Sequence, residues 1–567
     1  AASDVYKRQE QTTSNYEVLE NFEGRSALKM DDTGKTTFRV YIPKEGMYAM
    51  RIMYYPIEGY GTTMERMLYI DGHVPFSEAR YLYFPRQWAY ELEEVVHEDG
   101  TVTYEFFTDV RGDELRPVRV AQSSWEDYFL RDWVGFEMDP FEFYFSEGEH
   151  TITLEAAREP MCISQITLYP YVEEAPYEEV LAGWLAQGLT VQDDVEPIKV
   201  QAERPTTVSE RIILPGTERT SALTEPASPV NLRFNTGGAS GCNQWVRYEV
   251  DVPKEGLYEI DVRFRQNTLI GMFTSRRVKI NGEIQFREAS NCRFVYDTPF
   301  QVEPLNNGKT SFLFYFKEGK NIVEFEAVAG DMQSYILEIR DMVDELYAAY
   351  EKVLQITGPV PDAYRDYGFS RTAPDVLVTF AKTAKRLYEI ADELEAITGE
   401  MGDQVNALET YALLFKQMAA DEYEIAANML NFKSYTTGLQ NWMYSALGQP
   451  VTMDYFTIQS PNVERPRAVA NFFEYTWYEI RAFFGSFFHD YTTIAFRGHA
   501  NGMDYEEQIE MWVNGNRDDA LIARRIADEN FSPQYNIGVT YKVIQVGLME
   551  AIIAGMGPDI ASFSSCL

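Results

Sequence analysis

Three short segments of the sequence occur twice, in the same order. Residues 38–48 (Phe-Arg-Val-Tyr-Ile-Pro-Lys-Glu-Gly-Met-Tyr) match residues 248–258 (Tyr-Glu-Val-Asp-Val-Pro-Lys-Glu-Gly-Leu-Tyr). Two further matches follow in each copy, residues 69–72 with 279–282 and residues 143–148 with 314–319. Ordered repeats of this kind indicate two copies of one structural unit. The first copy carries about 39 extra residues between its second and third matched segments.

The matched segments predict short antiparallel strands joined by tight turns. Alternating apolar and polar residues run into and out of the Pro-Lys-Glu-Gly turns at residues 43–46 and 253–256. Asp-Gly at 71–72 and Asn-Gly at 281–282 lie between apolar runs, and such pairs are the strongest short signal for a hairpin. Many short strands with regular turns are typical of a β-sandwich.

This pattern resembles the galactose-binding-like jelly roll of many carbohydrate-binding modules. Members of that family carry a Pro-x-x-Gly-x-Tyr turn, an Asp-Gly or Asn-Gly hairpin, and a late strand after a glycine turn, and both copies here have all three. The resemblance covers about residues 16–170 and 198–340, and it implies β-sandwich domains at 10–175 and 196–340. Such domains bind glycans, but they also serve as spacers and as protein-binding modules, so all three roles stay open.

From about residue 338 the spacing of apolar residues changes to three and four, which is the helical period. The stretches 338–354 and 375–397 each run into Thr-Gly, a typical helix stop. Further helical patterns cover residues 403–420, 422–446 and 465–491. We predict an α-helical hairpin or bundle within a helical region at 341–495.

The last of these helical patterns is crowded with aromatic residues. They are Phe472, Phe473, Tyr475, Trp477, Phe483, Phe484, Phe487 and Phe488. An apolar stripe on a helix usually faces a core, so we expect these rings to be buried. The alternative is that the excess rings face a part of the protein that is missing from this sequence.

The end of the chain has the pattern of an α/β domain. Residues 496–507 look like a linker, and a strand at 509–513 then leads through Asn-Gly-Asn into a helix up to about residue 530. A strand at 539–546, a helix ending near Ala554 and a strand starting at Ile560 follow. The order β-α-β-α-β predicts the start of a parallel sheet at 508–567.

Three motifs in this last segment resemble the amino-terminal lobe of family 1 extracellular solute-binding proteins, the maltose-type group. They are residues 512–517 (Trp-Val-Asn-Gly-Asn-Arg), 535–539 (Tyr-Asn-Ile-Gly-Val) and 555–560 (Gly-Met-Gly-Pro-Asp-Ile). The family has Trp-x-Asn-Gly-Asp-Lys, Thr-Gly-Ile-x-Val and Gly-x-Gly-Pro-Asp-Ile in these places. The resemblance implies a truncated amino-terminal part of a periplasmic-binding-protein lobe, about its first fifth.

The resemblance also implies ligand-binding positions after the first strand of that lobe. By motif match they are Asn516 and Arg517, where the family has an acidic residue and Lys, with Asn514 beside them. Ligands of open α/β sheets sit beyond the carboxyl ends of the strands, where these residues fall. The competing interpretation is a helix N-cap at Asn516, with Arg517 in a solvated first turn.

Aromatic residues in the extra segment of the first copy are candidates for glycan binding. Trp88, Trp125 and Trp133, with Tyr128, lie in or near this insertion, and we expect them to be exposed because loops usually carry binding residues. Aromatic rings offer flat apolar faces to sugar rings. Sandwich cores account for most of the other aromatic residues.

Composition and motifs exclude several other function classes. The net charge of −38 repels nucleic acid and anionic lipid. The four cysteines form no Cys-x-x-Cys pair and only five histidines are present, so we expect neither a metal nor a cofactor. Cys242 and Cys292 either pair as a disulfide or, as we favour, are two free buried thiols. No metalloprotease, P-loop or nucleophile-elbow motif occurs, so we do not expect an enzyme.

The sequence therefore predicts the extracellular solute-binding component of a bacterial ABC importer, binding an oligosaccharide or another small solute. In the full-length protein it would be a membrane-anchored lipoprotein that works with a membrane permease. The alternatives are a surface carbohydrate-binding or adhesion protein, and an accessory part of a carbohydrate-active enzyme. Residues 1–9 resemble a sequencing artefact, and we expect both natural ends to be missing.

Overall fold

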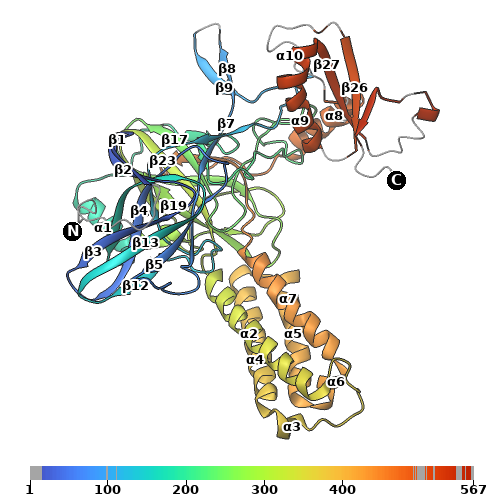
Figure 1. The fold of residues 1–567 in the computed structure, drawn as a ribbon. Coiled ribbons are helices and arrows are strands. Elements are labelled where there is room, and N and C mark those ends of the chain that lie inside the picture. Colours follow the sequence, from blue (N-terminus) through green and yellow to red (C-terminus); the bar gives the residue numbers. More distant parts are fainter. Residues whose placement is uncertain are drawn as a thin grey trace.

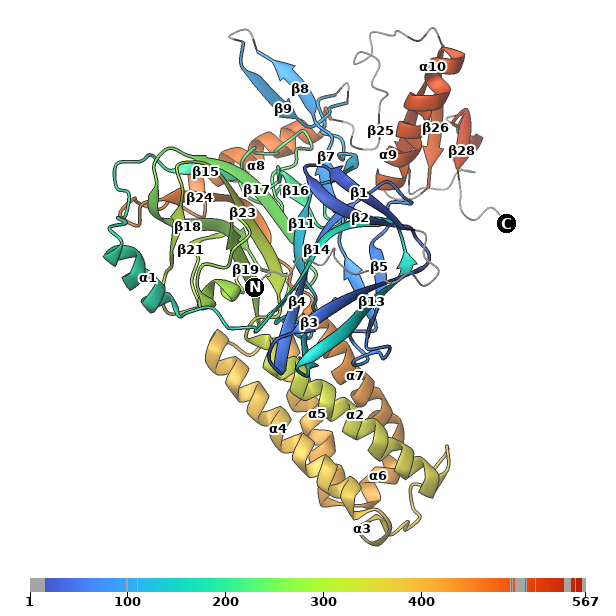
Figure 2. The same cartoon turned by 60° about the vertical axis from the view of Figure 1, so that its left-hand side comes forward.

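The fold consists of two β-sandwiches, a helical bundle and a small parallel sheet (Figures 1 and 2). The computed structural model describes residues 16–562, except 98–99, 110, 490, 492, 495–504, 506, 515–516, 545–551 and 556. The proposed artefact at 1–9 lies outside the described residues. The bundle and the parallel sheet lie at opposite ends of the molecule, with the sandwiches between them (Figures 1 and 2).

The first sandwich has two antiparallel sheets. One sheet has the order β1 (Tyr16–Phe22), β2 (Arg25–Met30), β14 (Met161–Tyr169), β4 (Gly46–Pro56), β11 (Glu126–Phe129), with β12 (Glu142–Phe145) also pairing with β4. The other has the order β3 (Lys35–Ile42), β13 (Gly148–Arg158), β5 (Met64–Ile70), β6 (Tyr81–Phe84). Alternate residues such as Met50, Ile52 and Tyr54 on β4 are buried, as expected for strands with one face on a core.

The second sandwich repeats this topology. One sheet has the order β10 (Arg119–Gln122), β7 (Gln87–Tyr90), β16 (Thr207–Val208), β17 (Trp245–Val252), β23 (Gly319–Val328), β19 (Phe273–Ile280), β20 (Cys292–Val295). The other has the order β15 (Ile198–Gln201), β24 (Thr452–Gln459), β18 (Gly256–Arg265), β21 (Gln301–Pro304), with β22 (Leu313–Phe316) also pairing with β18. Helix α1 (Tyr177–Ala186) lies in the segment between the two sandwiches.

The repeated turn motif has the same hydrogen bond in both copies. The Tyr48 hydroxyl donates to the Lys44 carbonyl at 2.7 Å, and the Tyr258 hydroxyl donates to the Lys254 carbonyl at 2.6 Å. The turn carries the chain from β3 in one sheet to β4 in the other, and from β17 to β18 in the second copy. The tyrosine in the motif therefore fixes the crossing between the two sheets.

The repeated hairpin motif is also conserved in its bonding. The first residue of each turn has positive φ, 50° at Asp71 and 56° at Asn281, a conformation that Asp and Asn tolerate. An Asp71 side-chain oxygen accepts from the Thr151 backbone N–H at 2.8 Å, and that of Asn281 accepts from Ile322 at 2.9 Å. The side chain thus ties the hairpin to the neighbouring strand.

The helical bundle is inserted into the second sandwich. The four long helices are α2 (Met332–Thr357), α4 (Pro374–Thr398), α5 (Asp403–Ala420) and α7 (Met429–Leu447), with short α3 (Phe369–Thr372) and α6 (Tyr423–Ala427). α2 packs against α4 and α7, and α5 packs against the same two helices. At 1.5 Å per residue the longest helix extends about 39 Å, and the bundle projects from the sandwiches as a rod (Figure 1).

Strand β24 corrects the predicted boundaries at 196–340 and 341–495. It follows the bundle in sequence, yet it lies between β15 and β18, and its residues from Met453 onward are buried. Its counterpart in the first sandwich, β14, directly follows β13 and holds the same place between β2 and β4. The bundle therefore separates the last two strands of the second sandwich, and the sandwich is complete only with β24, which ends at residue 459.

The extra segment of the first copy joins the two sandwiches. Its strands β7 and β10 extend the large sheet of the second sandwich, because Trp88 of β7 pairs with Val208 of β16. Strands β8 (Glu93–Val96) and β9 (Val102–Glu105) form a hairpin that projects away from both sandwiches (Figure 2).

The end of the chain forms the predicted parallel sheet. Its order is β25 (Thr493–Ile494), β27 (Ile537–Val543), β26 (Glu507–Val513), β28 (Ile560–Ser562), with β27 and β28 parallel to β26 and β25 antiparallel. Helix α9 (Arg517–Ile526), a π-turn at Ala527–Phe531 and α10 (Ser532–Tyr535) connect β26 to β27. Met511 faces Ile560 across the β26–β28 pair. Most of the predicted linker at 496–507 lies outside the described residues.

Helix α8 (Phe472–Ser486) departs from the prediction of a buried aromatic stripe. The eight aromatic residues expected in a core are between 47 % and 90 % exposed. The opposite side of the helix rests on the second sandwich, where Tyr478 is buried and Gly485 lies close to Val230. The helical period was correct, but the face that contacts the protein is the one with few aromatic rings.

Candidate functional site

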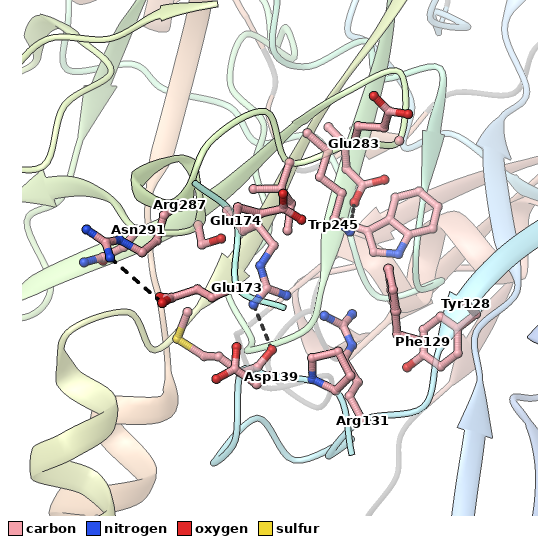
Figure 3. Close-up of a pocket in the computed structure, with 18 of the residues that line it drawn as sticks. Tyr128, Phe129, Arg131, Asp139, Glu173, Glu174, Trp245, Glu283, Arg287 and Asn291 are labelled. Atoms are coloured by element: carbon pink, nitrogen blue, oxygen red, sulfur yellow. Dashed lines mark hydrogen bonds and ion pairs between the residues drawn. The ribbon is translucent and has the colours of Figure 1, made fainter. Parts of the chain in front are cut away.

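A cleft of about 1170 Å³ lies between the two sandwiches (Figure 3). We call it the inter-sandwich cleft. One wall comes from β4, β11 and the end of β14 in the first sandwich, and the other from β17, β19 and β23 in the second. Most of the lining belongs to the outer, polar faces of the two sheets, and Tyr54 of the first sandwich core also reaches the cleft.

The floor of the cleft is a buried ion-pair network that joins the sandwiches. Arg131 of the first sandwich pairs with Glu326 of the second. Arg247 of the second sandwich pairs with Glu126 of the first at 3.0 Å and with Glu324 of its own sheet at 2.6 Å. Moving the two walls apart would break these pairs and leave uncompensated buried charges, which costs free energy. The network therefore holds the two walls in a fixed relation.

The charges of the floor are maintained at neutral pH. Burial alone would raise the pKa of Glu326, but the nearby Arg131, Lys279 and Arg277 outweigh it and hold that pKa well below its ordinary value. The pKa of Glu324 is also lowered, because Lys279 and Arg247 outweigh its burial. Both carboxyl groups are therefore ionised wherever the protein is folded at ordinary pH.

The first-sandwich wall combines aromatic faces with a cation. The Arg51 guanidinium lies 4.3 Å from the ring centroid of Phe129 and 5.3 Å from that of Tyr169. It also pairs with Asp127 at 2.9 Å. Tyr128, on the same strand as Phe129, has the Arg131 guanidinium 5.6 Å from its ring centroid. The arginines thus order the rings of this wall.

The rim of the cleft is polar and carries carboxylates. The Tyr171 hydroxyl donates to Asp139 at 3.1 Å. The burial of this hydroxyl and the negative charge of Asp139 both raise the pKa of Tyr171. Glu173 lies 3.9 Å from Arg287, and this contact is one of those drawn as dashed lines in Figure 3. The segment from Tyr171 to Glu174 thus passes along the opening between the sandwiches. Its side chains offer hydrogen-bond acceptors beside the guanidinium of Arg287.

The three tryptophans predicted to bind glycan do not lie together. Trp88 is only 7 % exposed and belongs to the core of the second sandwich, so the expectation that it is exposed is wrong. Trp125 is partly buried, packs edge-on against Phe22 and Tyr55, and its indole N–H donates to a backbone carbonyl at 3.1 Å. Trp133 is also partly buried.

Trp133 stacks on Tyr83 with ring centroids 5.4 Å apart. Each of the three tryptophans thus has a separate neighbourhood and a structural role. Of the aromatic residues singled out from the sequence, only Tyr128 lines the inter-sandwich cleft. The cleft also contains Phe129, Tyr169 and Tyr171, which the sequence analysis did not single out. The strand pattern does not predict that the outer faces of two sheets meet.

The parallel sheet has its own candidate site at the carboxyl end of β26. Because β27 and β28 lie on opposite sides of β26, the strand order reverses there, and ligands of open α/β sheets bind at such a crevice. Asn514 is exposed at this point, and its backbone N–H donates to the Ser562 carbonyl at 3.1 Å. Asn516 lies outside the described residues.

Arg517 is partly buried at the start of α9 and points back toward the body of the protein. One guanidinium nitrogen lies 3.3 Å from the Tyr491 carbonyl and another 3.5 Å from the buried carboxylate of Asp113. Asp113 also lies 3.0 Å from His489. Arg517 therefore connects the parallel sheet to the sandwich insertion, a role that the motif match did not suggest.

Within the part of the chain that the structure describes, cysteines, metals and membrane spans add no further site. Cys162, Cys242 and Cys292 are free thiols. Throughout the described ranges, no group of three or more His, Cys, Asp or Glu side chains is placed to hold a metal ion. Among the helices that the structure describes, none combines the length and apolar character needed to cross a bilayer.

Residues 334–445 match the family model described as "Bacterial solute-binding protein, 4-helix bundle domain". The match runs from the first turn of α2 to the last turn of α7. No curated protein matches the chain.

Among solved structures, a family 35 carbohydrate-binding module from Clostridium thermocellum is similar over 24 % of this chain and 90 % of its own, at 18 % identity and a TM-score of 0.17. A carbohydrate-binding module of Cellvibrio mixtus lichenase 5A is similar over 30 % and 95 %, at 10 % identity and a TM-score of 0.15. A Paenibacillus cycloisomaltooligosaccharide glucanotransferase is similar over 57 % of this chain and 45 % of its own, at 12 % identity and a TM-score of 0.17.

Proposed function

We propose that this chain is the extracellular solute-binding component of a bacterial ABC importer, that it binds a carbohydrate, and that it is not an enzyme. The observation that carries this proposal is the match of residues 334–445 to the bundle of bacterial solute-binding proteins. The parallel sheet later in the same chain supports it, because its strand order reverses beside Asn514, and ligands of open α/β sheets bind at such a point.

In this proposal the solute binds at the carboxyl ends of the parallel strands. Backbone groups and polar side chains after β26, with Asn514 among them, donate and accept hydrogen bonds from the solute. Closure of a second lobe over the solute would shift the protein toward a form that a membrane permease recognises. The sandwiches would hold glycan near the cell surface, so that their contribution to capture comes through a raised local concentration.

The partner assigned by this proposal is a membrane permease, which a crosslinking experiment tests. The protein is displayed on cells that carry the permease genes of its own locus and is crosslinked in the presence of oligosaccharides. Recovery of permease subunits with the protein supports the importer role. Recovery of no permease subunit under any solute condition contradicts it.

A non-transport role in surface attachment is the second candidate, and the inter-sandwich cleft favours it. The cleft is lined almost entirely by the sandwiches and the segment that joins them, with only the first turn of α2 added from the bundle, and no residue of the parallel sheet lines it. If the protein retains cells on an insoluble glycan while solute uptake is unchanged by its loss, attachment is the function.

A further inference from the structure

We propose that the inter-sandwich cleft is a binding site for a neutral oligosaccharide, gripped by both sandwiches at once. This inference rests on the proposed function, since it assigns a glycan-binding site to the accessory sandwiches. It is a site distinct from the crevice beside Asn514, because the cleft is lined by residues of the sandwiches and the first turn of α2 alone.

The cleft has the size of a ligand site and its shape is set in advance. Its volume of about 1170 Å³ lies slightly above the usual range of roughly 300–1,000 Å³ for small-molecule pockets. The Arg131–Glu326 and Arg247–Glu126 pairs connect the walls across the floor, and the side chains of Arg131 and Glu326 are 9 % and 0 % exposed. A ligand therefore does not have to order the two domains when it binds, which lowers the entropic cost of binding.

The lining matches the chemistry of sugar hydroxyls. Each hydroxyl both donates and accepts a hydrogen bond, so a site for a sugar chain needs donors and acceptors close together. At the rim, Glu173 and Arg287 face each other at 3.9 Å, too far apart for a strong ion pair and close enough to bind adjacent hydroxyls. The partly buried rings of Phe129 and Tyr171 add apolar surface for the C–H faces of sugar rings.

The charge of the lining selects a neutral ligand. The cleft is lined by eight cationic and nine carboxylate side chains, so it offers no excess of positive charge. Arg51, Arg247 and Lys279 are already paired with carboxylates at 3.0 Å or less. A uronic acid that binds Arg51, Arg247 or Lys279 would have to break one of these pairs, and one that binds Arg287 would lie beside the carboxylate of Glu173, and both cost free energy.

The test compares variants by isothermal titration with soluble neutral oligosaccharides, using α- and β-linked gluco-, manno- and xylo-oligomers, and with oligogalacturonate as the acidic counterpart. The full chain is used throughout. The double variant Tyr171→Ala/Arg287→Met removes one apolar contact and one donor from the rim, and each side chain is outside the buried floor network. Tyr60→Ala is the control, because Tyr60 is 85 % exposed and does not line the cleft.

We expect at least one neutral oligomer to bind, with an affinity about tenfold weaker in the double variant and unchanged in Tyr60→Ala. Melting temperatures of the three proteins establish that each is folded, and Arg287→Met alone serves if the double variant is unstable. Binding that persists in the cleft variants, or a preference for oligogalacturonate, overturns the cleft proposal and leaves the importer proposal standing. Failure of every carbohydrate to bind overturns both.

Discussion

Arg131 of the first sandwich and Glu326 of the second form an ion pair in which both side chains are almost completely buried. Glu326 receives further cations from its own sheet, Lys279 at 3.0 Å and Arg277 at 3.5 Å. One carboxylate thus connects two domains and stabilises three cations.

Replacing that carboxylate should destabilise the protein strongly. Glu326→Gln leaves two nearly buried arginines and the partly buried Lys279 without their shared partner, and breaking a buried pair in this way costs about 3–5 kcal/mol. Urea denaturation of the full chain measures the change in the free energy of unfolding. The matched control is Glu318→Gln on an exposed turn, which should change it by no more than about 0.5 kcal/mol. Equal effects of the two substitutions would contradict the network.

Glu203 should make the protein less stable as pH rises. Burial raises the pKa of Glu203 to about 8, against an ordinary value of 4.5. Between pH 4.5 and pH 8 the folded state binds more protons than the unfolded state. The free energy of unfolding therefore keeps its full contribution from Glu203 at low pH, and it falls by up to about 1.4 kcal/mol per pH unit as the pH rises through this range. In Glu203→Gln this loss should disappear.

Melting temperatures of both proteins from pH 5 to pH 9 test this. Asp261 and Asp454 also have pKa values raised to about 6 by burial, so both curves should fall across the acidic half of the range. The difference between the two curves isolates Glu203 and should grow toward pH 8. A constant difference across the range would refute the assignment.

The placement of β24 predicts which fragments fold. A protein ending at residue 340 lacks β24, which exposes the apolar faces and open edges of β15 and β18. We expect that fragment to aggregate or to lose the second sandwich. A protein ending at residue 470 keeps β24 and should fold, with a cooperative melting transition and dispersed amide resonances. A soluble, folded fragment ending at 340 would show that β24 is dispensable.

The exposed face of α8 predicts unequal effects of substitution along one helix. Phe473 is 81 % exposed, so Phe473→Ser should change the free energy of unfolding by less than about 0.5 kcal/mol. Tyr478 is 5 % exposed and its hydroxyl donates to the Arg219 carbonyl at 2.9 Å, so Tyr478→Ala should cost about 3–5 kcal/mol. Thermal melts of the two variants give the comparison, and a larger loss for Phe473→Ser would contradict the orientation of α8.

The sequence predicted the elements whose signals are local. The Tyr48 and Tyr258 turns, the hairpins at Asp71 and Asn281, and the parallel sheet that contains β26 and β28 follow from patterns within about 50 residues. The fold class, with two sandwiches, a helical bundle and an α/β start, is confirmed on these grounds.

The features that the sequence did not predict depend on distant partners. Strand β24 is eight residues long and is separated from its sheet neighbour β18 by the whole bundle, so no local pattern assigns it to a sandwich. Trp88 was expected at the surface because it lies in an insertion, yet its strand extends the other domain's sheet. The cleft exists only because charged outer faces of two sheets meet, and charge on an outer strand face is the usual pattern for solvent exposure.

Solute uptake tests the central claim most directly. Radiolabelled neutral oligosaccharides are supplied to cells with and without the gene for this protein, in a background that retains the permease genes of its locus. We predict that uptake of at least one oligosaccharide is lost with the gene and restored when the gene is returned. Uptake that is the same in both strains for every oligosaccharide would contradict the account.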